Sequence, residues 1–170
     1  IRRFYVPDLG EDLILVAGAE ARHALHVLRL DQGATVHLFD GRATEAVGHI
    51  RSVSNDSFTV QVASRSIQPS SDGPRLTLAV AVPKGDRADW MIEKCAELGI
   101  HHLRLLRCER SAVVPGETKV ERWRRKVIAA SKQSGAGRLM DIEGPSPISE
   151  VLRVADAPAR TWYADVGPGY

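Results

Sequence analysis

The side chains of this chain that could act on a ligand gather in two short segments, each shortly after a mainly apolar stretch. Glu109-Arg110-Ser111 follows residues 103–106, and Pro83-Lys84-Gly85-Asp86 follows residues 76–82. If the apolar stretches are strands of an open α/β sheet, both segments lie where such sheets collect their ligands. Glu109-Arg110-Ser111 could contact a ligand there, or it could make a structural salt bridge, and the sequence leaves both interpretations open.

Residues 83–86 stand between a predicted strand and a predicted helix, where backbone N–H groups and Lys84 could meet an anion. The segment lacks the glycine spacing of dinucleotide-binding loops and the full phosphate loop of nucleotide triphosphatases. It therefore supports neither cofactor. A plain turn with an exposed lysine explains it equally well.

Histidines could supply metal ligands in two places. His23 and His26 are three residues apart on a predicted helix, and His101 and His102 are adjacent. No carboxylate or cysteine completes either set, so we expect no metal site. No serine stands in a nucleophile elbow, so the sequence also offers no candidate for covalent hydrolysis.

Composition sets the class of protein. Hydrophobic residues make up 44% and charged residues 26% of the chain, as in ordinary soluble globular proteins. The apolar runs fall far short of the roughly 20 residues that cross a bilayer, and no signal-peptide pattern opens the sequence, so we expect a cytoplasmic protein without a membrane partner. Cys95 and Cys108 have no second pair, and we interpret both as packing thiols. The sequence begins at Ile1 rather than at methionine, so it need not be a complete gene product.

Turn-forming residues from Gln68 to Pro74 divide the chain. They include no large apolar side chain, as expected for a connection between two cores, and we place a domain boundary between residues 72 and 73. Residues 1–72 carry 7 basic and 9 acidic groups, and residues 73–170 carry 16 and 12. The formal charges are thus −2 and +4, an asymmetry that permits contact with a polyanion in the second part.

The first part has the pattern of a small β structure. Strands are predicted at residues 3–6, 13–16, 35–40 and 57–63. Asp40-Gly41 and Asn55-Asp56 provide turn residues, so residues 34–64 are predicted to form an antiparallel meander within a barrel-like sheet.

One helix interrupts this predicted sheet. Its apolar face has helical spacing and consists of Ala21, Ala24, Leu25 and Leu28. Arg22, His26 and Arg29 are predicted to share another face, which gives the helix a basic stripe. Periodicity alone favours a solvated face over a binding surface.

The second part alternates strand and helix, as an α/β layer does. Strands are predicted at residues 76–82, 103–106 and 161–164, and helices at residues 86–98, 119–134 and 147–154. The first strand is apolar throughout, which is typical of a parallel strand covered on both faces. Asp86 is predicted to cap the first helix, and Gly99 to end it. The long helix is predicted to bury Trp123 and to present a strongly basic side elsewhere.

In this order, these features resemble the bacterial 16S ribosomal RNA uracil-N3 methyltransferases of the knotted SPOUT class. The resemblance spans residues 3–142 and rests on His23-Ala24-Leu25-His26-Val27-Leu28-Arg29-Leu30, Leu38-Phe39-Asp40-Gly41, Lys84, Trp90, Glu93-Lys94, Glu97-Leu98-Gly99, Glu109-Arg110-Ser111, Arg122-Trp123 and Gln133-Ser134-Gly135. Glu97-Leu98-Gly99 and Glu109-Arg110-Ser111 are its most specific parts.

The resemblance implies an α/β protein with an N-terminal PUA-like β-barrel that grips ribosomal RNA, over residues 1–72. Residues 73–170 would be the N-terminal part of a SPOUT domain of the trefoil-knot type. It also implies S-adenosyl-L-methionine as cofactor, 16S ribosomal RNA or the 30S subunit as partner, and a homodimer at full length. The family's glycine-rich GPEGG segment and its leucine-arginine-glutamate-threonine loop are expected beyond Tyr170. The cofactor-binding residues would lie there, and residues 1–170 alone would be inactive.

The family reaction methylates uridine N3, an imide nitrogen that must first lose its proton. Donors aimed at the uracil oxygens would stabilise the resulting anion. Arg110 is our candidate for such a donor and Gln133 for fixing the base edge, whereas no residue can be named as the general base. Relatives tend to place an arginine after Gly135, where this chain has Ala136-Gly137, so only Arg138 remains as a local basic candidate. The predicted RNA-binding residues are Arg2, Arg3, Arg22, His26, Arg29, Lys84 and Arg138.

Two other functions stay open. A chain that truly ended at Tyr170 could be an RNA-binding module without catalysis. A small-molecule α/β enzyme would be favoured if residues 83–86 held a nucleotide phosphate.

Overall fold

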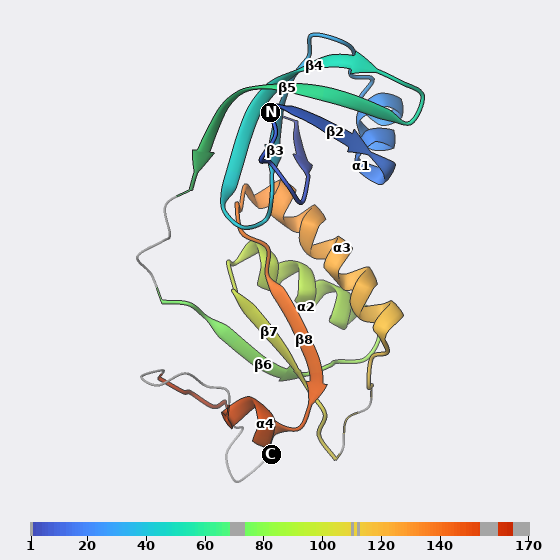
Figure 1. Cartoon of the computed structure of the whole chain (residues 1–170). Coiled ribbons are helices and arrows are strands. Elements are labelled where there is room, and N and C mark those ends of the chain that lie inside the picture. The colour runs from blue at the N-terminus through green and yellow to red at the C-terminus, as the bar shows by residue number, and fades with distance from the viewer. Residues whose placement is uncertain (1, 69–73, 110, 112, 154–159, 165–170) are drawn as a thin grey trace.

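The computed structural model of the chain describes residues 2–68, 74–109, 111, 113–153 and 160–164. Its strands form two sheets (Figure 1). Each sheet has its own hydrophobic core. The predicted boundary between residues 72 and 73 lies outside the described residues. We call the two parts the half-barrel (residues 2–68) and the α/β unit (residues 74–153).

The half-barrel is a five-stranded sheet in the order β1-β3-β4-β5-β2. Its strands are β1 (Arg3–Tyr5), β2 (Leu13–Ala17), β3 (Thr35–Phe39), β4 (Thr44–Val53) and β5 (Ser57–Ile67). Strands β3, β4 and β5 pair antiparallel, which confirms the predicted meander. Strand β1 adds to β3 in parallel and β2 adds to β5 antiparallel, but β1 and β2 do not pair with each other. The sheet is therefore curled and open.

A bulge in β4 helps the sheet to curl. The register with β5 shifts between Val47 and Gly48, and a Cβ atom at position 48 would lie 2.4 Å from the carbonyl oxygen of Gln61. Only glycine fits so close to the neighbouring backbone. A bulge increases the local twist of a strand pair, which bends β4 around the core.

The helical segment of the half-barrel is shorter and less regular than the sequence predicts. Helix α1 (Gly18–Arg22) passes into a π-helical turn, η1 (His23–Val27), and Ala21 and Ala24 are fully buried as expected. Arg29 lies beyond this turn with a left-handed backbone (φ 52°). The prediction that Arg29 shares a helical face with Arg22 and His26 is therefore wrong, because the wider turn and the helix end change its direction.

The α/β unit contains a parallel sheet in the order β6-β7-β8. Its elements are β6 (Thr77–Ala81), α2 (Asp86–Glu97), β7 (His102–Leu106), α3 (Glu117–Ser134), β8 (Asp141–Ser146) and α4 (Ile148–Arg153). The buried core of this unit joins Leu103 and Leu105 of β7 to the inner faces of α2 and α3. Helix α3 buries the side chains that its periodicity predicts, with Trp123 fully covered.

Strand β6 differs most from its prediction. Four of its five residues are exposed, and Leu78 keeps 37% of its surface accessible. The strand is at the edge of the described sheet. The apolar run therefore identified a strand correctly but not its surroundings, because periodicity carries no information about what covers each face.

Other expectations in this unit are also corrected. Strand β8 was missed because only Ile142 and no alternating pattern marks it, and residues 161–164 form no strand. Helix α2 is capped by Gly85, and Asp86 is its first helical residue. Cys95 is buried, as a packing thiol should be, but Cys108 is exposed.

One carboxylate ties α2 to α3. Oδ1 of Asp89 accepts hydrogen bonds from the buried Trp123 indole N–H (2.7 Å) and from Arg122 (2.7 Å). Nζ of Lys126 lies 3.5 Å from Oδ2 of Asp89. The hydrogen bond from Trp123, together with the charges of Arg122 and Lys126, outweighs desolvation and lowers the pKa of Asp89 below its usual value.

We expect Asp89→Ala to lower the free energy of unfolding by about 1–3 kcal/mol, because the buried indole N–H loses its acceptor. Asp89→Asn keeps an acceptor oxygen and should lose less. Since folding lowers the Asp89 pKa, its contribution is present above the unfolded value of about 3.9 and is lost as pH falls through the folded pKa. Urea unfolding at neutral and acidic pH measures both effects, and equal stability of Asp89→Ala and the parent at neutral pH would contradict this role.

Candidate functional site

The half-barrel and the α/β unit meet where the turn after β3 lies against the segment after α3. Arg42 and Arg138 form an isolated antiparallel bridge, flanked by backbone hydrogen bonds of 3.1 and 2.9 Å. Gly41 permits this approach, because its φ is +73° and a Cβ there would lie 2.6 Å from the Leu139 side chain. The bridge sets the two arginines opposite each other across the junction.

Side chains fix the same junction. Lys132 on α3 donates to both carboxylate oxygens of Glu20 on α1, at 3.0 and 2.8 Å. Arg3 on β1 pairs with Glu45 of β4 and donates to the backbone carbonyl of Ser131, at 3.2 Å. These side chains are 11–22% exposed, so the ion pairs are shielded from solvent more than ordinary surface pairs. Backbone and side-chain contacts together hold the half-barrel against the end of α3.

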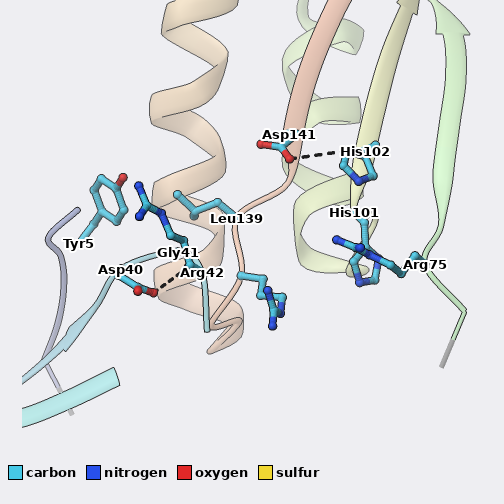
Figure 2. A pocket seen from close by; sticks show the side chains of 10 residues that line it. Tyr5, Asp40, Gly41, Arg42, Arg75, His101, His102, Leu139 and Asp141 are labelled. Atoms are coloured by element: carbon cyan, nitrogen blue, oxygen red, sulfur yellow. Dashed lines mark hydrogen bonds and ion pairs between the residues drawn. The ribbon is translucent and has the colours of Figure 1, made fainter. Parts of the chain in front are cut away.

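A hollow of about 380 Å³ opens beside the Arg42–Arg138 bridge (Figure 2). We call it the junction hollow. Its charged and titratable lining residues are Tyr5, Arg42, Arg75, Arg138, His101, His102, Asp40 and Asp141. Arg75 precedes β6, His101 precedes β7, His102 begins β7 and Asp141 begins β8. The α/β unit therefore contributes the amino ends of its parallel strands.

The carboxylates of the junction hollow do not neutralise its arginines. Oδ1 of Asp40 accepts the backbone N–H groups of Arg42 (2.7 Å) and Thr44 (3.0 Å). The Asp141 side chain is 70% exposed, and its Oδ2 lies 3.6 Å from Nδ1 of His102. Among the described residues, Arg42 and Arg138 make no salt bridge. The lining therefore carries unpaired positive charge.

The pKa of His101 is lowered in this hollow. Desolvation, together with the neighbouring Arg75, His102 and Arg138, lowers the pKa of His101. The Leu76 N–H lies 3.4 Å from Nδ1 of His101, so this nitrogen accepts and Nε2 carries the ring proton. The neutral ring thus offers an N–H donor in a cationic hollow. Such a lining suits an anion with several oxygens.

The structure spreads the predicted RNA-binding residues over several surfaces. Arg2, Arg22, His26, Arg29 and Lys84 are exposed: Arg2 precedes β1, Arg22 lies on α1, His26 lies on η1, and the other two lie in loops. Arg138 is exposed and lines the junction hollow. Arg3 is already engaged by Glu45 and Ser131, which leaves its guanidinium little surface for a phosphate. Of the seven predicted residues, only Arg138 lies in the hollow.

Only one of the two predicted catalytic residues lies in the described part of the chain. Arg110 lies outside the described residues. Gln133 is exposed near the end of α3, next to the Lys132–Glu20 contact. Because Glu109 follows β7 and Lys84 follows β6, both belong to the carboxyl edge of the sheet, whereas the junction hollow lies at its amino edge. Strands of five residues separate the edges by about 16 Å.

Arg42, Arg75 and His101 were missed by sequence reasoning. Arg42 directly follows Asp40-Gly41, which we used only as a turn signal, and His101 was weighed only as a metal ligand. The order of residues contains no sign that the turn after β3 would meet the segment after α3. The junction is a property of the packed structure.

The described residues do not fit S-adenosylmethionine. Its sulfonium is positively charged, so the cationic junction hollow disfavours it. A second hollow of about 300 Å³ is lined by Arg104, Glu143 and Glu150 among others, which is too charged for an adenine ring. We assign none of these residues to the cofactor.

The described part of the chain has neither a cluster of metal-ligating side chains nor a helix that could span a membrane. It contains no group of three or more metal-ligating side chains. None of its helices combines the length and apolarity that a membrane span requires.

Two protein families match this sequence. Residues 71–165 match a family described as RNA methyltransferase domain, and residues 16–63 match a family described as RNA methyltransferase PUA domain. The first match alone spans 95 of the 170 residues. The matches fall on the α/β unit and the half-barrel respectively.

Individual relatives agree with these matches. The chain is 29% identical over 148 residues to Ribosomal RNA small subunit methyltransferase E of Synechocystis, covering 87% of this chain and 48% of that protein. A Legionella pneumophila structure, assigned as a methyltransferase and holding its cofactor SAM, has 26% identity and a TM-score of 0.82 over 94% of this chain and 72% of that one. A Porphyromonas gingivalis structure assigned as an rRNA-methyltransferase has 31% identity and a TM-score of 0.81, over 93% and 65%.

The chain spans about half the length of the curated relatives it matches, 52% of the Bacillus subtilis protein and 48% of the Synechocystis protein. Over this span the predicted fold is confirmed as a PUA-like half-barrel followed by a parallel α/β unit of SPOUT type. The chain therefore belongs to the RNA methyltransferase family, with a PUA-domain match in its half-barrel and a methyltransferase-domain match in its α/β unit.

Proposed function

We propose that this chain forms the RNA-holding domain and the first part of the catalytic domain of a methyltransferase. The enzyme would move a methyl group from S-adenosylmethionine to N3 of a uridine in 16S ribosomal RNA. The observation that carries this proposal is the agreement in sequence and structure over nearly the whole chain, at 26% identity and a TM-score of 0.82, with a methyltransferase structure that holds SAM. The relatives named small-subunit ribosomal RNA methyltransferases support RNA as the substrate class.

The proposed chemistry requires the site to favour a uracil anion. Loss of the N3 proton spreads negative charge over the two uracil oxygens, and a guanidinium aimed at them would lower the barrier. We propose Arg110 for this donor. Gln133, the predicted residue for orienting the base edge, lies near the end of α3 beside the half-barrel and at the opposite edge of the sheet from Glu109, so we do not assign it to the same base. S-adenosylmethionine, when bound, supplies the electrophilic methyl group, and the described residues leave the general base unassigned.

The same proposal extends to the partners, the compartment and the domain division of the complete enzyme. The 30S subunit would present the uridine, the complete enzyme would act as a homodimer in the cytoplasm, and the division into residues 1–72 and 73–170 would separate RNA holding from catalysis. The exposed basic side chains on the half-barrel support an RNA-holding role. Their attraction to phosphates falls steeply with salt.

Arg22→Glu combined with Arg29→Glu should weaken binding to small-subunit RNA at moderate salt. Both side chains are exposed, so the loss comes from removing two positive charges and adding two negative ones near phosphates. Fluorescence anisotropy with a labelled 16S ribosomal RNA fragment measures the affinity, and Arg51→Glu on β4 serves as a control for general charge. Unchanged affinity of the double variant would reject the role.

Titration of the complete enzyme with S-adenosylmethionine tests the methyltransferase proposal against the alternative of an RNA-binding module without catalysis. Calorimetry should show saturable binding of the cofactor. An enzyme that binds 16S ribosomal RNA but not S-adenosylmethionine would favour the non-catalytic module. The third hypothesis, a small-molecule enzyme, would require nucleotide binding at residues 83–86 and no RNA binding.

A further inference from the structure

We propose that Arg42, Arg75 and Arg138 form an anion clamp at the junction of the two units, which binds one backbone phosphate of the substrate RNA away from the reacting uridine. This inference rests on the proposed function, because it takes the anion to be part of the substrate RNA. It adds Arg42, Arg75 and His101 to the RNA-binding residues that the sequence suggested.

The pairing of Arg42 with Arg138 is the first ground. Cross-strand neighbours that carry the same charge destabilise a β bridge. Here the flanking hydrogen bonds place them opposite each other, and neither makes a salt bridge to a described carboxylate. An anion bound in the hollow beside this bridge would offset the repulsion between the two positive charges.

The donors around the hollow are the second ground. Arg42 comes from the half-barrel, and Arg138, Arg75 and His101 come from the α/β unit. Figure 2 labels Arg42, Arg75 and His101 in the hollow. Guanidinium groups match the oxygens of a phosphate in pairs. His101 can add its Nε2–H, because Nδ1 already faces the Leu76 amide. The Nδ1 atom of His102 has no hydrogen-bond partner among the described residues, but it faces Oδ2 of Asp141 at 3.6 Å, so we do not count it among the donors to the anion.

The place of the hollow decides which part of the RNA it would hold. Lys84 follows β6 and Glu109 follows β7, at the opposite edge of the sheet from His101 and Asp141. With about 16 Å between the edges, one nucleotide cannot reach both. The clamp would therefore hold the strand and not the reacting base. It would lower the KM for RNA without changing kcat.

The test uses Arg42→Gln, Arg138→Gln and the double variant in the complete enzyme, with a 16S ribosomal RNA hairpin as probe. Each single change should weaken RNA binding about tenfold and reduce the dependence of log affinity on log salt by about one. The double variant should lose much less RNA affinity than the product of the two single losses, because both arginines bind the same phosphate. The KM for RNA should rise in parallel while kcat stays constant.

A control and a stability measurement separate binding from folding. Arg124 is exposed on α3, pairs with Glu121 and does not line the hollow. Arg124→Gln should therefore change the affinity for RNA by less than about twofold. Removing one of two repelling arginines should leave the melting temperature equal or higher, whereas a purely structural arginine would lower it. Arg42→Lys should restore part of the affinity.

Three results would overturn the clamp. RNA affinity and KM that are unchanged in both variants would reject it, although methyl transfer would show that the proposed function stands. Loss of inorganic-phosphate binding with unchanged RNA binding would mean that the hollow takes a free phosphate. A parent enzyme that neither binds the RNA nor methylates it would remove the proposed function along with the clamp.

Discussion

Arg110→Ala in the complete enzyme should lower kcat for methyl transfer by about two to three orders of magnitude, with little change in RNA affinity. This is the size of effect found when a preorganised donor to a developing anion is removed. The proposal derives from sequence, since Glu109-Arg110-Ser111 follows β7 at the carboxyl edge where open α/β sheets bind ligands. Single-turnover assays at saturating RNA and cofactor measure the chemical step.

Arg110→Lys distinguishes a directed donor from a general positive charge. Lysine keeps the charge but loses the planar fork of the guanidinium, so it should restore only part of kcat. Arg124→Ala on the outer side of α3 is the matched control and should retain full activity. A kcat for Arg110→Ala close to that of the parent would exclude Arg110 from the catalytic step.

Trp123→Ala should lower the free energy of unfolding by about 3–5 kcal/mol. The Trp123 side chain is fully buried between α3 and the rest of the α/β core, and its indole N–H bonds to Asp89. Alanine would leave a cavity and would remove the indole donor from the Asp89 carboxylate. Because whole domains are stable by only about 5–15 kcal/mol, chemical unfolding should show a large shift of the midpoint.

Trp90→Ala is the control for this change. Trp90 lies on α2, but 64% of its surface is exposed, so the same substitution removes little buried area. We expect its effect to stay within about 0.5 kcal/mol. Equal destabilisation by the two alanine variants would contradict the role of Trp123 as the centre of the α/β core.

Local patterns predicted much of this fold. The alternation in residues 57–63 and the turn at Asp40-Gly41 gave the antiparallel strands, because side-chain period and turn chemistry are local properties. The apolar spacing in residues 119–134 identified the buried face of α3. The family resemblance supplied the order of the two domains and the barrel type, which local patterns could not.

The predictions that were wrong concern features set by contacts between distant segments. The exposed face of β6 follows from what lies beside it, and β8 becomes a strand by pairing with β7 and not by its own polar sequence. The π-helical turn moved Arg29 off the face of Arg22 and His26. The junction hollow joins residues almost 100 positions apart, Arg42 and Arg138, so its positive charge could not be seen along the sequence.

The two units together suggest a division of labour for the proposed enzyme. The half-barrel offers exposed basic groups, the junction offers unpaired arginines, and the carboxyl edge of the sheet offers Lys84 and the segment near Arg110. The contacts of Lys132 with Glu20 and of Arg3 with Ser131 would keep their spacing fixed.

The measurement that tests the central claim most directly is nucleoside mass spectrometry of small-subunit RNA after incubation with the complete enzyme and isotope-labelled S-adenosylmethionine. We expect labelled 3-methyluridine at a single position of 16S ribosomal RNA. Absence of labelled methyl groups from the RNA, or methylation of a base other than uracil, would contradict the proposed activity.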